Sequence, residues 1–261
     1  MLGIHQSFQN PMSFTVREAY NIGADTFQMF IRNNRNGSRR HITAGEIQSF
    51  NEALAVYGIK KYVIHAAYCM NLCTDDSYRQ QKCLSILKED LALLNMLHGE
   101  KYYVLHPGSS KDLDLTTALR NVANILHQII PVIGDVHIAI EFMAGAGTQV
   151  LCTPEQVEYL MVLCYDVPNI GCCFDTCHVC GAGQSLVPTF NRLKQYISVV
   201  HLNGSAAIFG SHVDRHASIE NSVGPDNLIE FYKTLPKDLP VILEVPGDYL
   251  LHDYFLLKER L

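Results

Sequence analysis

The sequence predicts an α/β protein, a single-domain (β/α)8 TIM barrel over residues 1–261, from three observations. The chain has 261 residues, close to the roughly 250 residues of a typical barrel of this kind. Short apolar runs of strand length alternate with segments of helical period, which favours βαβ units and a parallel sheet. No linker or low-complexity segment interrupts this pattern, so we expect one domain.

The expected strands are eight short apolar runs. They cover residues 2–5, 26–31, 62–65, 102–106, 136–142, 170–175, 197–202 and 241–245. A doubly wound open sheet is the alternative architecture. The first strand–helix turn lacks G-x-G-x-x-G, and G-x-x-x-x-G-K-[ST] is absent from the chain. The nucleotide-binding forms of an open sheet are therefore disfavoured.

Segments of helical period lie between most of these strands. Thr43 and Glu46 have the spacing of a capping box, and Gly58 is the expected end of that helix. Thr153 is followed by Pro154, a residue that suits the first position of a helix. The other expected helices cover residues 13–22, 76–98, 115–130, 187–196, 227–235 and 249–258.

Composition limits the possible partners. A net charge of −6 argues against a wholly basic nucleic-acid binder, although bound cations can supply the positive charge that a phosphate needs. The chain has no run of about 18 apolar residues and no signal-peptide pattern. We therefore expect a cytoplasmic protein, a monomer, without a membrane partner. One local basic cluster contains Arg32, Arg35, Arg39, Arg40 and His41.

The cysteine count also bears on the cellular compartment of the protein. Nine cysteines, an odd number without a secreted context, predict reduced thiols. Four of them are crowded enough to suggest a zinc knuckle: Cys172, Cys173, Cys177 and Cys180. Because no second C-x-x-C pair follows, we interpret these residues as small buried hydrophobic side chains.

Histidines and carboxylates recur where the expected strands end. The C-terminal ends of barrel strands converge on one face, where active sites lie. Glu141 and Glu244 stand inside apolar strands, and a buried carboxylate needs a partner or a cation. The complete series of candidate metal ligands is His65, His106, Glu141, Asp175, His178, His201, Asp214, His216 and Glu244.

Nine ligands exceed the needs of one zinc ion, which takes about four. Three ions with one bridging carboxylate would use all nine. Mixed histidine and carboxylate ligation suits Zn²⁺, with Mn²⁺ as an alternative. Clustered divalent ions suit the hydrolysis of phosphate esters, because they activate water and hold the attacking and leaving oxygens.

The chain resembles the endonuclease IV family of apurinic/apyrimidinic endonucleases over nearly its whole length. The motifs that carry the resemblance are Gly3-Ile-His-Gln-Ser7, His65-Ala-Ala-Tyr68, His106-Pro-Gly108, Glu141-Phe-Met-Ala-Gly145, Asp175-Thr-Cys-His178, His201-Leu-Asn203, Asp214-Arg-His216 and Glu244-Val-Pro246. The resemblance implies a TIM barrel that holds three zinc ions and takes part in base excision repair.

The resemblance also assigns the ligands and the reaction. It implies that His65, His106 and Glu141 hold one zinc ion. Glu141 bridges to a second, held also by Asp175, His201 and Glu244, and the third ion is held by His178, Asp214 and His216. The implied reaction is in-line attack by a metal-bound hydroxide on the phosphate 5′ to an abasic site. It leaves a 3′-hydroxyl and a 5′-deoxyribose phosphate, with Glu244 and Glu141 as catalytic residues.

By the same resemblance, the substrate is double-stranded DNA with abasic sites. Arg35 and Tyr68 match positions that push into bent DNA, where an inserted ring or guanidinium recovers stacking lost with the missing base. A solvated surface charge is the alternative interpretation of Arg35. His5, which also closes a strand, is grouped with these expected DNA contacts.

The chain departs from the family pattern outside the ligands. Gly204 and Ala206 replace Asp and Lys, Ala217 replaces an acidic residue, residues 219–224 replace an Ile-Gly-x-Gly stretch, and Asn36-Gly37 replaces an aromatic residue. Two alternatives stay open. A sugar or sugar-phosphate isomerase or epimerase of the xylose-isomerase-like barrel would need one metal ion, and a non-catalytic DNA-binding relative would bind without cleavage.

Overall fold

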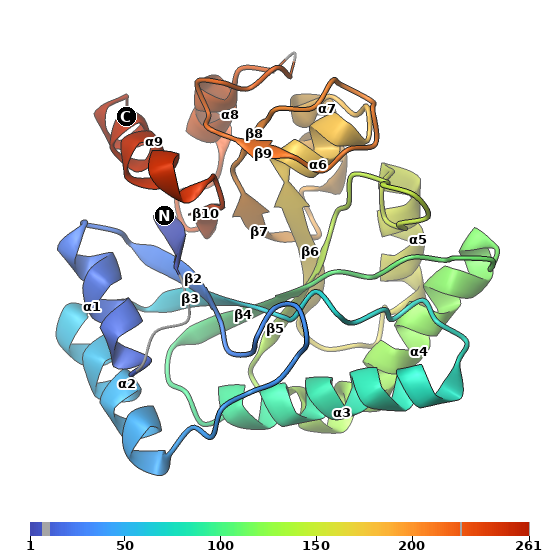
Figure 1. The fold of residues 1–261 in the computed structure, drawn as a ribbon, viewed down its shortest axis with the longest axis horizontal. Coiled ribbons are helices and arrows are strands. Elements are labelled where there is room, and N and C mark those ends of the chain that lie inside the picture. Colours follow the sequence, from blue (N-terminus) through green and yellow to red (C-terminus); the bar gives the residue numbers. More distant parts are fainter. Residues whose placement is uncertain (7–10, 225, 261) are drawn as a thin grey trace.

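Eight parallel strands close into a barrel in the computed structural model, which describes residues 1–6, 11–224 and 226–260. The order around the barrel is β1-β10-β7-β6-β5-β4-β3-β2, and β1 and β10 lie side by side to close it (Figure 1). The expected TIM barrel is therefore confirmed. The strands are β1 (Leu2–Gln6), β2 (Thr26–Phe30), β3 (Lys61–His65), β4 (Glu100–Leu105), β5 (His137–Glu141), β6 (Ile170–Asp175), β7 (Ile197–His201) and β10 (Val241–Leu243).

The helices lie outside the strands (Figure 1). They are α1 (Ser13–Asn21), α2 (Ala44–Tyr57), α3 (Ser77–Leu94), α4 (Leu115–Ile133), α5 (Pro154–Leu163), α6 (Thr176–Gly181), α7 (Leu186–Leu193), α8 (Leu228–Thr234) and α9 (Gly247–Glu259). No helix of the described residues has both the length and the apolar character needed to cross a membrane. The predicted elements agree with these to within a few residues at their ends.

Helix ends follow the local sequence. Thr43 caps α2 by accepting a hydrogen bond from the backbone N–H of Glu46, and Gly58 ends the helix in the left-handed conformation. The predicted capping box is only half formed, because the Glu46 carboxylate pairs with Arg40 and accepts the N–H of Met12 instead. At α5, Thr153 caps the helix before Pro154 as expected.

Two apolar cores hold the barrel together. The larger lies between the strands and the helices and takes its residues from both. The smaller is formed by strand residues alone, Val63, Tyr102, Val104, Ala139, Cys173, Val199 and Ile242. Because strand side chains alternate between faces, these seven fill the barrel interior. They form its floor beneath the C-terminal strand ends.

Two local features were not predicted. Helix α6 follows β6 directly, with Asp175 as its cap, so His178 lies on a helix. Strands β8 (Gly204–Ser205) and β9 (His216–Ala217) form a two-stranded antiparallel sheet, so His216 is the first residue of a short strand. These elements are short and depend on contacts between distant segments, which periodicity cannot reveal.

Candidate metal centre

Six of the expected ligands lie two residues after an interior apolar residue. With a strand period of two, such a residue points into the barrel as well. The pairs are Val63 and His65, Val104 and His106, Ala139 and Glu141, Cys173 and Asp175, Val199 and His201, and Ile242 and Glu244. The apolar floor is therefore capped by a layer of imidazoles and carboxylates at the C-terminal mouth. His106 and Glu244 follow the last residues of β4 and β10, so these two strands end earlier than predicted.

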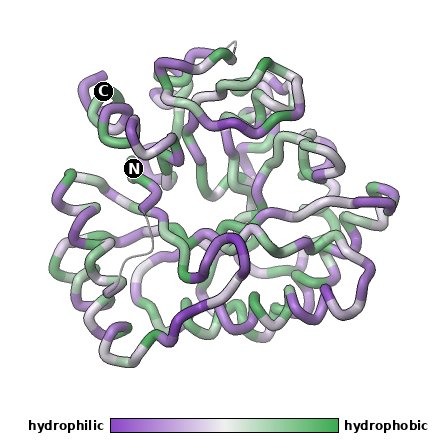
Figure 2. The backbone as a smooth tube through the Cα atoms, in the orientation of Figure 1, coloured by the Kyte–Doolittle hydropathy of each residue, from purple (hydrophilic) through white to green (hydrophobic). Residues whose placement is uncertain are grey.

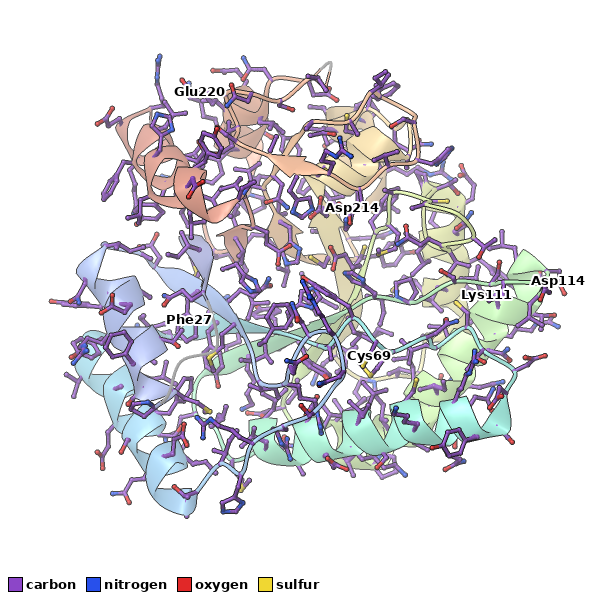
Figure 3. The ribbon with its side chains drawn as sticks, viewed as in Figure 1. Phe27, Cys69, Lys111, Asp114, Asp214 and Glu220 are labelled. Carbon is purple, nitrogen blue, oxygen red and sulfur yellow. The ribbon has the colours of Figure 1, made fainter. Side chains whose placement is uncertain are left out.

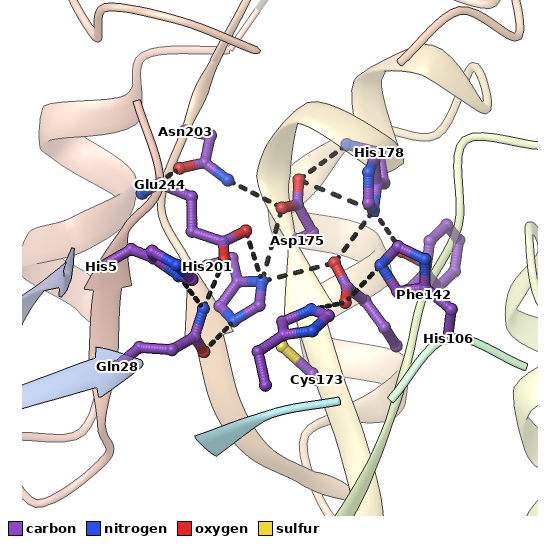
Figure 4. A network of polar contacts seen from close by, with 12 residues as sticks. His5, Gln28, His106, Phe142, Cys173, Asp175, His178, His201, Asn203 and Glu244 are labelled. Atoms are coloured by element: carbon purple, nitrogen blue, oxygen red, sulfur yellow. Dashed lines mark hydrogen bonds and ion pairs between the residues drawn. The ribbon is translucent and has the colours of Figure 1, made fainter. Parts of the chain in front are cut away.

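All nine expected ligands gather at this mouth in three groups. The ligand atoms within each group lie within 4.8 Å of one another. The groups are His65, His106 and Glu141; Glu141, Asp175, His201 and Glu244; and His178, Asp214 and His216. Glu141 belongs to two groups. Figure 4 shows five of the ligands converging from different parts of the barrel: His106, Asp175, His178, His201 and Glu244. The structure thus brings together the side chains that the sequence singled out.

Glu141 lies at the centre of the mouth. Its Oε2 is 3.2 Å from Nε2 of His65 and 3.1 Å from Nε2 of His106, while its Oε1 is 3.3 Å from Nδ1 of His201. Burial by itself raises the pKa of Glu141. Attraction to His106 and His201 and hydrogen bonds with His106 and His178 together outweigh burial and hold that pKa well below its ordinary value. A buried carboxylate of this kind requires nearby positive charge.

The second group surrounds His201. Its Nδ1 lies 3.1 Å from Oε2 of Glu244 and 3.7 Å from Oδ2 of Asp175, in addition to Glu141. One ring nitrogen thus faces three carboxylates. Without a proton on Nδ1 the ring would direct a lone pair at these carboxylates, so the arrangement requires a proton or a cation between these groups.

The third group is built on Asp214, which approaches His178 and His216. The Nε2 atoms of these histidines lie 3.2 and 3.4 Å from the Asp214 carboxylate. Among the described residues, both Nε2 atoms are buried and lack a hydrogen bond of acceptable geometry. Buried polar atoms are nearly always satisfied. Two orphan imidazole nitrogens beside one carboxylate therefore form a donor set that fits a cation.

The opposite ring nitrogens of three histidines contact backbone carbonyls. Nδ1 of His65 is 2.8 Å from the oxygen of Ala66, and Nδ1 of His178 is 2.9 Å from the oxygen of Phe142. Nδ1 of His216 is 3.2 Å from the oxygen of Glu244. With the proton on Nδ1, Nε2 keeps its lone pair for a metal, which is the usual arrangement of metal-binding histidines.

These observations fit divalent cations at all three groups. Histidine and carboxylate donors suit Zn²⁺ and Mn²⁺ alike. Cys177 also lies near Asp175 and His216, but burial raises the pKa of its thiol to about 12.

Two buried amides were missed by the sequence analysis. Gln28 contacts His201, His5 and Glu244, and Asn203 donates to Oδ2 of Asp175 at 2.7 Å (Figure 4). Asn203 also accepts the backbone N–H of Glu244 at 2.7 Å. The sequence did contain a sign that Gln28 is buried, because this polar residue stands between Phe27 and Met29 in an apolar strand.

A hollow of about 730 Å³ opens beside the centre. Its lining includes Glu244, His5 and His216 and residues of the loop between β2 and α2. That loop is a hydrophilic stretch in Figure 2. Tyr68 also lines the hollow, and its ring stacks on His106 with centroids 5.0 Å apart.

The three expected DNA contacts differ in position. Tyr68 and His5 line the hollow, and Nδ1 of His5 is 3.0 Å from Oε1 of Glu244. Arg35 is exposed on the loop and does not line the hollow. The loop itself is fixed from below by Arg32, whose Nε donates to Asp90 at 2.6 Å and whose Nη1 donates to the oxygen of Gly37 at 3.0 Å.

The unusual residues around His216 pack against one another. Gly204 pairs with Ala217 across β8 and β9. A Cβ atom on Gly204 would lie 2.2 Å from the backbone oxygen of Ser218, so no larger residue fits without a shift. The buried Asp253 accepts hydrogen bonds from the hydroxyl of Ser218 and the N–H of Ile219, both at 2.8 Å. The departures thus form a compact support for the His216 ligand.

The sequence profile of the family described as xylose isomerase-like TIM barrel matches residues 16–259. A probable endonuclease 4 from Finegoldia magna is 32% identical over 257 residues, which cover 95% of this chain and 91% of that protein.

Two solved structures are similar to this chain over almost its whole length. Endonuclease IV from Thermus thermophilus superposes with a TM-score of 0.85 and 26% identity, covering 100% of this chain and 99% of its own. A D-tagatose 3-epimerase-like protein has a TM-score of 0.74, but at 18% identity, with 99% of this chain and 96% of its own covered, it shares the fold alone.

Proposed function

Because the chain belongs to the endonuclease IV family of nucleases, within the xylose isomerase-like TIM barrels, we propose that it is a zinc-dependent apurinic/apyrimidinic endonuclease. Its substrate is double-stranded DNA with an abasic site. It hydrolyses the phosphodiester on the 5′ side and leaves a 3′-hydroxyl and a 5′-deoxyribose phosphate.

The observation that carries the proposal is the set of three ligand groups, two of them joined through Glu141. A single-metal isomerase has use for Glu141, Asp175, His201 and Glu244. It has no use for the other two groups, one of which contains the buried Nε2 atoms of His178 and His216 that lack a hydrogen bond. Phosphate ester hydrolysis does use several cations at one mouth.

The ligand residues position the chemistry. Bound divalent cations would activate a water molecule and withdraw charge from phosphate oxygens. Glu244 is a ligand that also lines the open hollow, so its carboxylate reaches both the buried centre and a bound substrate. Glu244 is therefore proposed to orient the attacking water, and Glu141 to fix the spacing of the two ligand groups that it joins.

Recognition of the abasic site is assigned to the hollow. The Tyr68 ring is supported by His106 and by Phe30, whose centroid is 5.3 Å away, and it remains partly exposed. An aromatic face held in this way can fill the gap left by a missing base. Arg35 stands on the neighbouring loop, where its exposed guanidinium can reach DNA phosphates.

The test is a cleavage assay on duplex DNA that carries one abasic-site analogue. Zinc-loaded protein should cut on the 5′ side of the analogue and leave undamaged duplex intact. Glu244→Gln should retain the fold and lose most of the cleavage, whereas Glu259→Gln, on the exposed end of α9, should cleave normally. Intact substrate at high enzyme concentration would refute the proposal, and binding without cleavage would favour the non-catalytic relative.

The number of metal ions bound per chain distinguishes the nuclease from the alternative function, a sugar isomerase or epimerase. Two or three zinc ions per chain favour the nuclease. One ion per chain favours a sugar isomerase or epimerase, the activity class of the structurally similar epimerase-like protein. His106→Ala should remove the ion of its own group only, so an unchanged metal count would contradict the assignment.

A further inference from the structure

Gln28 occupies a central position beneath the ligands. It lies on β2, opposite His5 on β1, and its side chain is fully buried inside the barrel. Its Oε1 is 2.8 Å from Nε2 of His201, and its Nε2 donates to Oε1 of Glu244 (Figure 4). One amide thus bridges two ligands of the same group.

The chemistry of the neighbours fixes how this amide is oriented. A carboxylate only accepts hydrogen bonds, so the NH2 end must face Glu244. The carbonyl end then faces Nε2 of His201 and requires a proton there. With Nε2 protonated, the lone pair of a neutral His201 stands on Nδ1, the nitrogen that faces Glu141, Asp175 and Glu244.

His201 differs in this respect from three other histidines of the centre. His65, His178 and His216 are held through Nδ1 by backbone carbonyls, which no substitution removes. His201 is held through Nε2 by a side chain and presents Nδ1. Its orientation therefore depends on the identity of residue 28.

We propose that Gln28 is a positioning residue that fixes the tautomer of His201 and the carboxylate of Glu244, and so prepares the group of Glu141, Asp175, His201 and Glu244 for its cation. This inference deepens the proposed function and rests on the metal centre assigned there. Partners of this kind typically change metal affinity by about 10- to 100-fold when they are removed.

The variant that tests the proposal is Gln28→Met, which keeps the side-chain length and removes both hydrogen bonds. The matched control is Gln6→Met. Gln6 is a buried glutamine on β1 that donates to the backbone oxygen of Thr15 at 3.1 Å and lines none of the three ligand groups. Zinc affinity is measured by competition with a chromophoric chelator. The proton on Nε2 of His201 gives an NMR signal only while it is protected from exchange with solvent, and this signal is followed in zinc-loaded protein with ¹⁵N-labelled histidine.

Gln28→Met should bind its weakest-held zinc about 10- to 100-fold less tightly than wild type and lose the protected Nε2 proton, while Gln6→Met changes neither. Wild-type affinity with the proton retained in Gln28→Met would overturn the proposal, as would an equal loss in Gln6→Met. If Gln28→Met does not fold, Gln28→Glu takes its place. It keeps an acceptor for His201, so the proton must persist, and its loss would overturn the proposal.

These readouts do not involve DNA. Wild-type protein that binds zinc as expected and leaves abasic DNA uncut would refute the nuclease proposal alone. A normal nuclease in which Gln28→Met keeps wild-type zinc affinity and the Nε2 proton would refute the role of Gln28 alone.

Discussion

Replacing Asp90 with asparagine tests how the loop after β2 is held. Asp90 is fully buried on α3. Its Oδ1 accepts from Nε of Arg32 at 2.6 Å and Nη1 of Arg39 at 3.1 Å, and its Oδ2 accepts from the hydroxyl of Tyr103 at 2.7 Å. Arg32 in turn holds the oxygen of Gly37. One carboxylate therefore connects the helix layer to the loop that carries Arg35.

The expected loss is about 3 kcal/mol of unfolding free energy. Removing one partner of a buried ion pair costs about 3–5 kcal/mol. Two features place Asp90→Asn at the lower end of this range. Burial raises the pKa of Asp90 more than Arg32 and Tyr103 lower it, so the ionised carboxylate is itself costly. Arg32 also keeps Glu89 as a partner at 2.7 Å.

Urea unfolding at pH 7, followed by circular dichroism and by tyrosine fluorescence, measures the loss. A domain of this size shifts by about 2–4 °C per kcal/mol, so the melting temperature should fall by roughly 6–12 °C. The matched control is Asp114→Asn. Asp114 caps α4 at the edge of the molecule (Figure 3), and asparagine caps a helix about as well as aspartate, so its stability should barely change.

A loss below about 1 kcal/mol in Asp90→Asn would refute the reasoning, since a buried arginine left without its main partner cannot cost so little. The double variant with Arg32→Met locates the effect. If the ion pair is the cause, Asp90→Asn should cost clearly less when Arg32 is absent. Under the proposed function, Asp90→Asn should raise KM for abasic DNA more than it lowers kcat.

Three further predictions concern the metal, the ligand loop and pH. Dialysis against a chelator should lower the melting temperature, and added Zn²⁺ should restore it. A ligand present at about 100 times its Kd adds about 2.7 kcal/mol per site to the free energy of unfolding. An unchanged melting curve would contradict metal binding. Gly108→Ala should cost about 2–3 kcal/mol in urea unfolding, because φ is 104° and its Cβ would meet Oδ1 of Asn71 at 2.0 Å. Gly23 also has a positive φ, but an added Cβ would meet no atom within 4 Å, so Gly23→Ala should cost only about 1 kcal/mol. Equal losses of stability in the two variants would rule out the clash with Asn71 as the cause at Gly108. The hydrogen bond from Arg40 lowers the pKa of Glu46 in the folded protein below the value of 4.5 expected for the unfolded chain. The ion pair therefore stabilises the fold above pH 4.5, and this stabilisation is lost as pH falls through the lower pKa of the folded protein. Glu46→Gln should be about 1 kcal/mol less stable at pH 7, with the gap closing in acid; a gap that stays constant with pH excludes this ion pair as its cause.

The sequence by itself determined the barrel and the position of the six candidate ligands that end its strands. A strand period of two places a residue on the same face as its neighbour two positions away, so apolar residues such as Val104 and Ala139 predict where His106 and Glu141 point. Strand ends of a parallel barrel meet at one mouth. These rules are local or topological, and they need no knowledge of individual contacts.

Only the tertiary structure decided how these side chains are oriented. Nδ1 of His201 faces the carboxylates, while its Nε2 contacts Gln28, a residue 173 positions away in the chain. Helix α6 and the β8–β9 pair place His178 and His216 through contacts between distant segments. Asp90 holds a loop that begins on another strand. Hydrogen-bond partners of this kind are set by packing in three dimensions, and neither periodicity nor spacing along the chain encodes them.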